Sequence, residues 1–400
     1  MKLLFLITSL NRGGAERVLS QMSQNFPDDV ECTVLLNKKD SDDYPFNGEI
    51  ITLGIDDEFK MSIGFQLKVF LKRLSALRKL KKSGEYQACI SFMDSSNFAN
   101  VLTRNKRCKT IVSIHISYAG VDKKIYKWFV IPVAGYLYRF ADAIVPVSGI
   151  IKNELITNMH INANKVRVIY NAFNIKQLLN SAQQPIENTE IEKFIKDSFV
   201  FVNMGRLMRQ KGQPHLIRAF SKVRLQCKNA KLIVMGEGKE REYLEEIVKL
   251  YNLDSSVKIL PFQSNPYRIL AACNAYVFPS LWEGYPNALC EAIICGLPCI
   301  SADFRSGARE ILAPGTDIRY QNKDEIEYAQ YGILTPVCSG NKHTNLDTLE
   351  KEEELLAEAM ILLHKDKVLY ERYKNAANER AVQLDIKPVM QEWMDLINLA

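Results

Sequence analysis

Four charged side chains have the types and spacing to hold a diphosphate. Arg206 and Lys211 follow one apolar segment, while Glu283 and Glu291 bracket the start of a short helix expected near Asn287. A guanidinium fork and an ammonium are complementary donors for phosphate oxygens, and the unpaired amides of a first helical turn add partial positive charge. With one carboxylate for a ribose and one for a hexose, this set suits a nucleotide sugar. The competing interpretation is a group of solvated surface charges.

Glycines mark two further loops where a ligand could approach the backbone. Gly13 and Gly14 separate an apolar start from a helix whose free amides would lie behind them. Gly236 and Gly238 half-match the dinucleotide fingerprint, but Arg241 replaces its third glycine, and the next apolar segment ends without an acidic residue for a ribose. The pattern therefore does not favour NAD binding. Both an ordinary tight turn and a turn beside a nucleotide are consistent with it.

Two series of short apolar segments must position these loops. The first series comprises 2–9, 31–36, 88–92, 110–115 and 143–146, and the second comprises 199–203, 230–235, 257–260, 275–279 and 298–301. Apolar strands joined by amphipathic helices are typical of parallel sheets with right-handed crossovers. We therefore predict an α/β fold with two doubly wound domains, connected by the polar segment 174–196. Ligands of such sheets bind beyond the carboxyl ends of the strands, where the charged and glycine-rich loops fall.

Composition limits the class of protein. The 400 residues are 47% hydrophobic and 24% charged, which excludes a disordered chain. No apolar run reaches the roughly 18–20 residues that a membrane span needs. We expect the apolar start, residues 1–10, to be a first strand rather than a signal peptide. Nine scattered cysteines without zinc spacing indicate buried free thiols in a reducing cytoplasm.

The net charge of +6 is concentrated in the front part of the chain, which carries +8 through residue 172, whereas the remainder carries −2. Residues 65–82 are amphipathic at helical spacing, with Lys68, Lys72 and Lys79 on a basic side. The predicted apolar side comprises Leu67, Phe70, Leu71, Leu74 and Leu77. This helix, with the aromatic stretch 126–140, predicts docking on an anionic membrane surface. A core-packed helix with a solvated basic face is the alternative.

Taken together, the motifs resemble those of family 4 of the retaining glycosyltransferases, which have the GT-B fold. The resemblance rests on the sequences GGAE at 13–16, VIYN at 168–171, GRL at 205–207, KG at 211–212, GEG at 236–238 and EGYPN at 283–287. Glu283 and Glu291 reproduce the E-x7-E element of the family. The pairing of SFMDSSN at 91–97 with EGYPN most resembles enzymes that extend lipid-linked oligosaccharides with hexose or N-acetylhexosamine units.

The resemblance implies two Rossmann-like domains that face a central cleft. The acceptor would bind domain 1–172, completed by a C-terminal helix at 389–400, and the nucleotide sugar would bind domain 173–388. The catalytic residues implied are Glu283, His115, Arg206 and Lys211. The donor-binding residues implied are Gly14, Gly205, Arg206, Lys211, Gly236, Gly238, Gly284, Tyr285, Asn287, Ala288, Leu289 and Glu291. The acceptor and membrane residues expected are Gly13, Glu16, Lys68, Lys72, Lys79, Asp94 and His115.

We therefore expect transfer of a hexosyl or N-acetylhexosaminyl group from a nucleoside diphosphate, chiefly UDP, to a glycan or a polyprenyl-pyrophosphate-linked acceptor. The resemblance implies retention of configuration. Fixed cations and helix amides would stabilise the leaving diphosphate, so we expect no metal or other cofactor. We expect a cytoplasmic protein held peripherally on the inner membrane face, without a nucleic-acid partner. A nucleotide-sugar epimerase of the same fold and a non-catalytic nucleotide-sugar-binding subunit are the alternatives.

Overall fold

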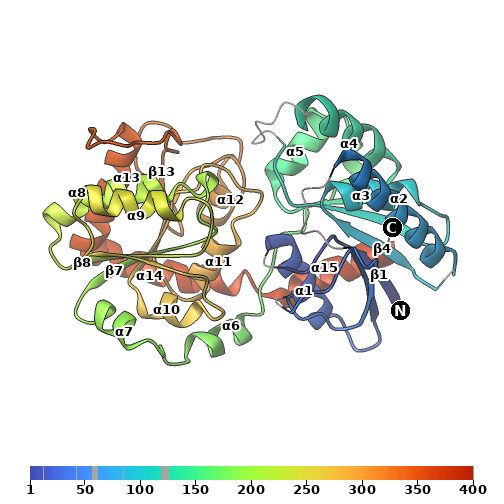
Figure 1. The fold of residues 1–400 in the computed structure, drawn as a ribbon, viewed down its shortest axis with the longest axis horizontal. Helices are drawn as coiled ribbons and strands as arrows, with labels where there is room; N and C mark the ends of the chain where they lie inside the picture. Colours follow the sequence, from blue (N-terminus) through green and yellow to red (C-terminus); the bar gives the residue numbers. More distant parts are fainter. Residues whose placement is uncertain (12, 42, 56–61, 84, 119–125, 400) are drawn as a thin grey trace. The chain divides into compact units, whose positions relative to one another are not determined.

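A computed structural model describes residues 1–11, 13–41, 43–55, 62–83, 85–118 and 126–399. The chain forms two compact units (Figure 1). Unit 1 comprises Met1–Ala172 and Ile386–Ala400, and unit 2 comprises Phe173–Asp385. The C-terminal helix α15 (Ile386–Leu399) therefore begins before the expected position 389. At this boundary the Phe173 amide donates to the carbonyl of Leu384 (3.0 Å).

Unit 1 is a parallel six-stranded sheet with the strand order β3-β2-β1-β4-β5-β6. Its strands are β1 (Lys2–Leu6), β2 (Glu31–Leu36), β3 (Glu49–Thr52), β4 (Ala88–Phe92), β5 (Lys109–Ile114) and β6 (Ala143–Pro146). Its other helices are α1 (Gly14–Asn25), α2 (Ile63–Lys82), α3 (Asp94–Leu102), η1 (Tyr126–Val130), α4 (Ile131–Leu137), η2 (Tyr138–Phe140), α5 (Gly149–Thr157) and η3 (Ala163–Lys165). The sequence did not predict β3, because this edge strand is half-exposed and lacks a continuous apolar run.

Unit 2 is a seven-stranded sheet with the order β12-β13-β11-β10-β7-β8-β9. Its strands are β7 (Phe199–Met204), β8 (Ala230–Met235), β9 (Val257–Leu260), β10 (Ala275–Phe278), β11 (Cys299–Ala302), β12 (Glu327–Tyr328) and β13 (Ile333–Thr335). Its helices are α6 (Ile175–Ala182), α7 (Thr189–Ile195), η4 (Arg209–Lys211), α8 (Gln213–Gln226), α9 (Arg241–Leu250), α10 (Tyr267–Ala272), α11 (Asn287–Ile294), α12 (Ala308–Leu312), α13 (Lys351–Lys365) and α14 (Lys367–Val382). The segment 174–196 is thus not a plain connection, since it forms α6 and α7.

The two sheets confirm the predicted doubly wound α/β fold, and each has a point where the strand order reverses. In unit 1 the reversal lies between β1 and β4, and in unit 2 it lies between β7 and β10. The loops that leave neighbouring strands in opposite directions leave a crevice at such a point, and ligands bind there. The loop after β7 carries Arg206 and Lys211, and the loop after β10 carries Glu283. In unit 1 the corresponding positions are Gly13 and Asp94.

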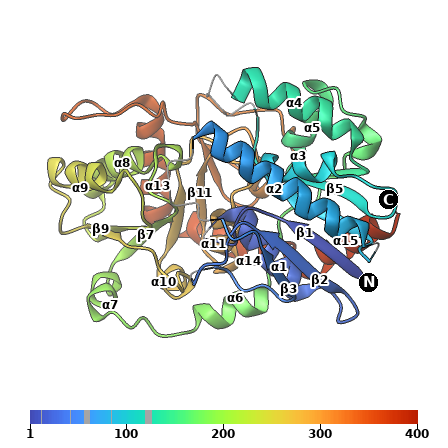
Figure 2. The same cartoon turned by 45° about the vertical axis from the view of Figure 1, so that its right-hand side comes forward.

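Helix α2 covers one face of the unit 1 sheet (Figure 2), and α1 and α15 cover the other. The apolar side of α2 expected from the sequence is not wholly buried, because Leu67 and Leu71 have exposed fractions of 58% and 55%. The buried side is displaced around the helix and includes two charged residues, Arg73 and Lys81. Arg73 donates to Asn37 Oδ1 (2.8 Å) and Ser95 Oγ (2.7 Å), so its burial is compensated.

All nine cysteines are free and eight of them are buried, which confirms the prediction of buried thiols. None of the described helices is long and apolar enough to span a membrane.

Candidate active site

An ion pair joins the two loops at the strand-order reversal of unit 2. Lys211 Nζ lies 2.6 Å from Glu283 Oε1, and the exposed fractions of the two side chains are only 19% and 10%. The second oxygen of Glu283 accepts a hydrogen bond from Gln210 Nε2 (3.2 Å), which also donates to the carbonyl of Trp282 (2.7 Å). The carboxylate of Glu283 is therefore fixed from both sides.

Gln210 was missed by the sequence analysis. Its only sequence signal is its place beside Lys211, because a glutamine side chain has no characteristic spacing to a residue in a distant loop.

Close backbone packing brings these loops together. Gly212 has φ of 64°, and a Cβ at this position would clash with the carbonyl oxygen of Pro279. The amide of Leu281 donates to the carbonyl of Gln210 (2.8 Å). Glycine is the residue that permits both the left-handed conformation and the close approach.

The glycines of the half-matched fingerprint serve backbone packing in the same way. A Cβ at Gly236 would clash with the carbonyl oxygen of Gly205, and one at Gly238 would clash with that of Leu207. The amide of Leu207 also donates to the carbonyl of Glu237 (2.7 Å). These contacts place the loop after β8 directly against the loop after β7, which carries the predicted diphosphate-binding cations.

Helix α11 begins at Asn287, which confirms the predicted helix start beside Glu283. The loop before it is held by Ser306 Oγ, which donates to the carbonyl of Gly284 (2.7 Å). Asn287 and Ala288 are partly exposed, but the amides of Asn287 and Leu289 donate to the carbonyls of Tyr285 and Pro286 (both 3.0 Å), so these two are not unpaired as predicted. Tyr285 and Leu289, also predicted to touch the donor, are buried.

The other two charged residues of the predicted site differ sharply in environment. Arg206 is exposed, and in the described part of the chain no carboxylate lies within ion-pair distance of its guanidinium. The side chain of Glu291 is buried, with an exposed fraction of 1%. The structure thus brings Lys211 into contact with Glu283, leaves Arg206 in solvent on the same loop as Lys211, and places Glu291 inside unit 2.

His115 follows β5 in unit 1 and lies against the sheet. Its Nε2 is 2.9 Å from Ser113 Oγ, and its ring packs on Phe92 with centroids 5.3 Å apart. It lines a small pocket with residues of α1 and α15, including Val18 and Trp393. Burial lowers the pKa of His115 to about 3. The imidazole is therefore neutral at working pH and can exchange hydrogen bonds but carries no charge.

Gly13, Gly14 and Glu16 lie at the start of α1, as predicted. Gly13 caps the helix, and a Cβ there would clash with the Glu16 carboxylate, which folds back over the turn. Gly14 is exposed.

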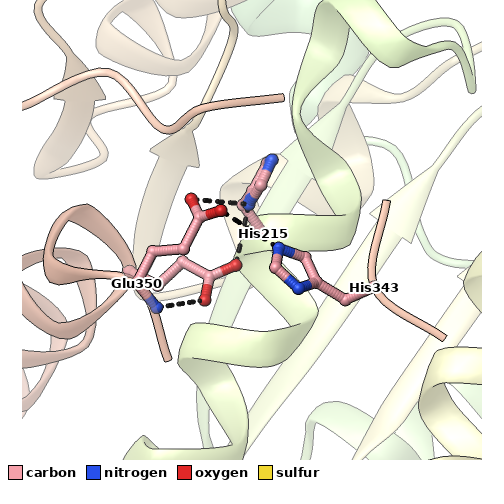
Figure 3. Close-up of side chains that lie close together, drawn as sticks. His215, His343 and Glu350 are labelled. Atoms are coloured by element: carbon pink, nitrogen blue, oxygen red, sulfur yellow. Dashed lines mark hydrogen bonds and ion pairs between the residues drawn. The ribbon is translucent and has the colours of Figure 1, made fainter. Parts of the chain in front are cut away.

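A cluster of metal-ligating residue types lies elsewhere in unit 2, where His215, His343, Glu350 and Glu353 place their ligand atoms within 4.8 Å of one another (Figure 3). The Gly340 amide donates to His215 Nε2 (3.1 Å), so the ring carries its proton on Nδ1. That proton donates to Glu353 Oε1 (2.7 Å). A metal ligand needs a free nitrogen lone pair, and His215 has none to offer in this arrangement.

Glu353 is equally committed to hydrogen bonds. Its Oε1 accepts a hydrogen bond from Arg218 Nε (2.9 Å), and its Oε2 accepts one from the Glu350 amide (2.9 Å). Burial opposes ionisation of Glu353, but the hydrogen bonds from His215 and Arg218 outweigh it and lower the pKa of the carboxyl. The four side chains of this cluster therefore form a hydrogen-bond network and do not fit a metal centre.

The neutral state of His115 gives a first testable prediction. In the folded chain the His115 ring binds a second proton only near pH 3, whereas an unfolded histidine binds one near pH 6.5. The unfolded state then binds more protons between these values, so stability falls as the pH falls through this window. We expect the His115 ring resonances, assigned with a His115→Gln variant, to remain those of neutral imidazole down to about pH 4. A titration midpoint near 6.5 would contradict this environment.

Comparison with known proteins identifies the family of this chain. Residues 12–177 match the model described as Glycosyltransferase Family 4, and residues 186–331 match the model described as Glycosyl transferases group 1. An uncharacterized glycosyltransferase of Methanocaldococcus jannaschii is 38% identical over 281 residues, which span 68% of this chain and 67% of the relative.

Two further similarities extend over nearly the whole chain. A Campylobacter jejuni protein named N-acetylgalactosamine-N,N'-diacetylbacillosaminyl-diphospho-undecaprenol 4-alpha-N-acetylgalactosaminyltransferase is 28% identical over 393 residues, or 96% of both chains. The crystal structure of Anabaena HepE in complex with UDP-glucose matches the fold with a TM-score of 0.74, at 21% identity, and covers 100% of both chains. With its two doubly wound units, this chain belongs to glycosyltransferase family 4 and has the GT-B fold.

Proposed function

We propose that this chain is a retaining glycosyltransferase that moves a hexosyl or N-acetylhexosaminyl group from a UDP-sugar to a glycan or a polyprenyl-pyrophosphate-linked acceptor. The observation that carries the proposal is the Lys211–Glu283 ion pair, which lies at the strand-order reversal of unit 2 beside the start of α11. The Campylobacter relative, aligned over 96% of both chains, bears the name of a transferase acting on a diphospho-undecaprenol substrate, which supports the acceptor class. UDP and retention rest on the resemblance to the family.

The two members of the ion pair would contact different parts of the donor. The Lys211 ammonium has three donors, and the contact with Glu283 uses one of them, so others remain for the phosphate oxygens of the donor. Arg206 is the second cation on the same loop and is free to close on the diphosphate. These two cations stabilise the charge that grows on the departing nucleoside diphosphate.

Glu283 would face the transferred sugar. Its carboxylate is held by Lys211 and Gln210 and keeps a fixed position when the donor binds. A fixed negative charge beside the sugar ring stabilises a transition state with oxocarbenium character, and its preorganisation avoids reorientation during the reaction. Glu291 would accept hydrogen bonds from the ribose, for which its buried side chain must become accessible on donor binding.

Substitution of Glu283 tests this assignment. We expect Glu283→Ala to bind the donor nucleotide nearly as tightly as the unchanged chain, because the diphosphate cations remain, and to lose transfer activity by about a hundredfold or more. The donor is first chosen as the UDP- or GDP-sugar that raises the melting temperature most. Binding is then measured by calorimetry and transfer by product formation.

Glu242→Ala is the matched control, because Glu242 is an exposed glutamate of the same unit. Undiminished kcat in Glu283→Ala would contradict the assignment. Conversion of the donor to an epimer without an acceptor would favour an epimerase, and donor binding without turnover would favour a binding subunit.

We also propose that turnover needs no metal ion, because Arg206 and Lys211 supply the positive charge that a divalent ion would otherwise bring to the diphosphate. The chain contains one Asp-x-Asp sequence, at 40–42 in unit 1. Asp40 is paired with Lys38 (3.4 Å), and Asp42 lies outside the described residues. We expect activity to persist in excess EDTA, measured by initial rates with and without the chelator. Complete loss that added Mn²⁺ restores would refute metal independence.

We further propose that unit 1 docks on the inner face of the cytoplasmic membrane. Exposed Leu67 and Leu71 lie on the same helix as exposed Lys68 and Lys79, so apolar and cationic side chains share the solvent-facing part of α2. This composition matches a helix that lies in a membrane interface. Lys72 is also exposed, although its Nζ donates to the carbonyl of Leu53 (2.5 Å).

Charge reversal on α2 tests the docking. Near an anionic bilayer each lysine contributes about 1 kcal/mol. We therefore expect Lys68, Lys72 and Lys79→Glu together to reduce cosedimentation with phosphatidylserine-containing liposomes by about tenfold or more. Reversal of three exposed lysines of unit 2, Lys228, Lys367 and Lys374, is the control with the same change in net charge. Equal binding by the α2 variant and the unchanged chain would contradict the proposal.

A further inference from the structure

Asp94 follows the strand at the reversal point of unit 1, as Glu283 does in unit 2. It is the first residue of α3, and only Met93 separates it from the end of β4. The residue before it, Met93, has φ of 70°, a conformation that a side-chain-bearing residue adopts at a cost. Backbone strain of this kind persists where the surrounding structure fixes it, and it places the Asp94 carboxylate at the open end of the sheet.

Three tyrosine hydroxyls donate to this one carboxylate. Tyr118 Oη lies 2.7 Å and Tyr138 Oη 2.8 Å from Asp94 Oδ1, and Tyr126 Oη donates to Oδ2. Burial, together with the nearby Asp94 charge, raises the pKa of all three tyrosines. They therefore remain protonated donors at every working pH, and the aspartate keeps its orientation.

The tyrosines are themselves held by buried groups. Glu154 accepts hydrogen bonds from the Tyr118 amide (2.9 Å) and from Ser117 Oγ (2.7 Å). Tyr138 is fully buried, and Asn97 Nδ2 donates to its hydroxyl (3.4 Å). This is a prearranged polar cluster and not a mobile surface acid.

In the part of the chain that the structure describes, the hydrogen bonds to the Asp94 carboxylate leave one acceptor position for a ligand. A carboxylate accepts about four hydrogen bonds, and the tyrosines supply three of them. Asp94 is partly exposed, so solvent or a ligand reaches it. Because the carboxylate can only accept, and because it repels phosphate, the ligand group that fits is a hydrogen-bond donor, of which a sugar offers chiefly hydroxyls.

Tyr126 also belongs to the most exposed aromatic segment of unit 1. It begins the helix η1, in which Trp128 and Phe129 have exposed fractions of 80% and 69%. The next helix, α4, exposes Tyr136 as well. The hydrogen bond from Tyr126 to Asp94 therefore ties an apolar outer segment directly to the carboxylate.

We propose that Asp94 binds a hydroxyl of the acceptor sugar and that Tyr126 is the positioning residue that connects this site to the exposed aromatic segment of η1. The inference rests on the proposed function, because it specifies where the acceptor of that transfer binds. Contact of η1 with the lipid part of an acceptor would then hold the carboxylate in place for the sugar part.

Substitutions that change only polar atoms test the inference. The donor is the UDP-sugar selected by melting temperature, and the acceptor probe is a polyprenyl-diphosphate-linked N-acetylhexosamine in detergent. We expect Asp94→Asn to lower kcat/KM for the acceptor about tenfold or more, the effect of losing a hydrogen bond to a charged group. We expect Tyr126→Phe to raise KM for the acceptor about threefold to tenfold with little change in kcat. Hydrolysis of the donor without acceptor should change less than about twofold in both variants.

Tyr136→Phe is the matched control. Tyr136 is an exposed residue of the adjoining helix α4, and its hydroxyl is not among those that donate to Asp94. The inference is overturned if Asp94→Asn keeps acceptor kinetics, if donor hydrolysis falls in parallel, or if Tyr126→Phe behaves like Tyr136→Phe. Melting temperatures identify a variant that fails to fold. If Asp94→Asn fails to fold, the acceptor kinetics of Tyr126→Phe test the inference.

A chain that transfers no sugar at all would contradict the proposed function separately. Direct calorimetric binding of the acceptor probe still tests the inference then, because Asp94→Asn must weaken that binding.

Discussion

The pairing of Lys211 with Glu283 is the constraint on which the proposed donor site of unit 2 depends. Both side chains are largely removed from water, and neither charge could be buried there without the other. The two loops must therefore close on each other, which the backbone contact at Gly212 permits and the hydrogen bonds of Gln210 fix. The result is a carboxylate with a set position and an ammonium with further donors, on the same loop as the exposed guanidinium of Arg206.

The two units apply the same topological rule with opposite electrostatics. In unit 2 the reversal of strand order brings the cations Arg206 and Lys211 to one loop beside Glu283, and these cations suit a diphosphate. In unit 1 the reversal gathers Asp94 with neutral tyrosines, and His115, near by on the next strand, is neutral too. That site carries excess negative charge, repels phosphate and suits hydroxyl donors. This distribution of charge agrees with the proposal that the sugar donor binds unit 2 and the acceptor binds unit 1.

Residue type alone misleads at two other places. His215 and Glu353 belong to a cluster that resembles a metal centre, but the Gly340 amide fixes the tautomer of the histidine and so removes the lone pair that a metal would need. On α2 the apolar residues Leu67 and Leu71 face solvent, while Arg73 is buried against polar partners. At His215 and at Arg73, the hydrogen bonds formed in the folded chain decide what the side chain does.

The sequence by itself determined five strands of each sheet, the doubly wound architecture and the helix start at Asn287, because these depend on local periodicity and on residues that begin and end helices. It did not determine β3 and β12, which lack a buried face, or β13, which is buried but only three residues long. It also missed Gln210 and the tyrosines around Asp94. Their roles arise from contacts between segments far apart in the chain, and only the order of the strands in each sheet decides which loops meet.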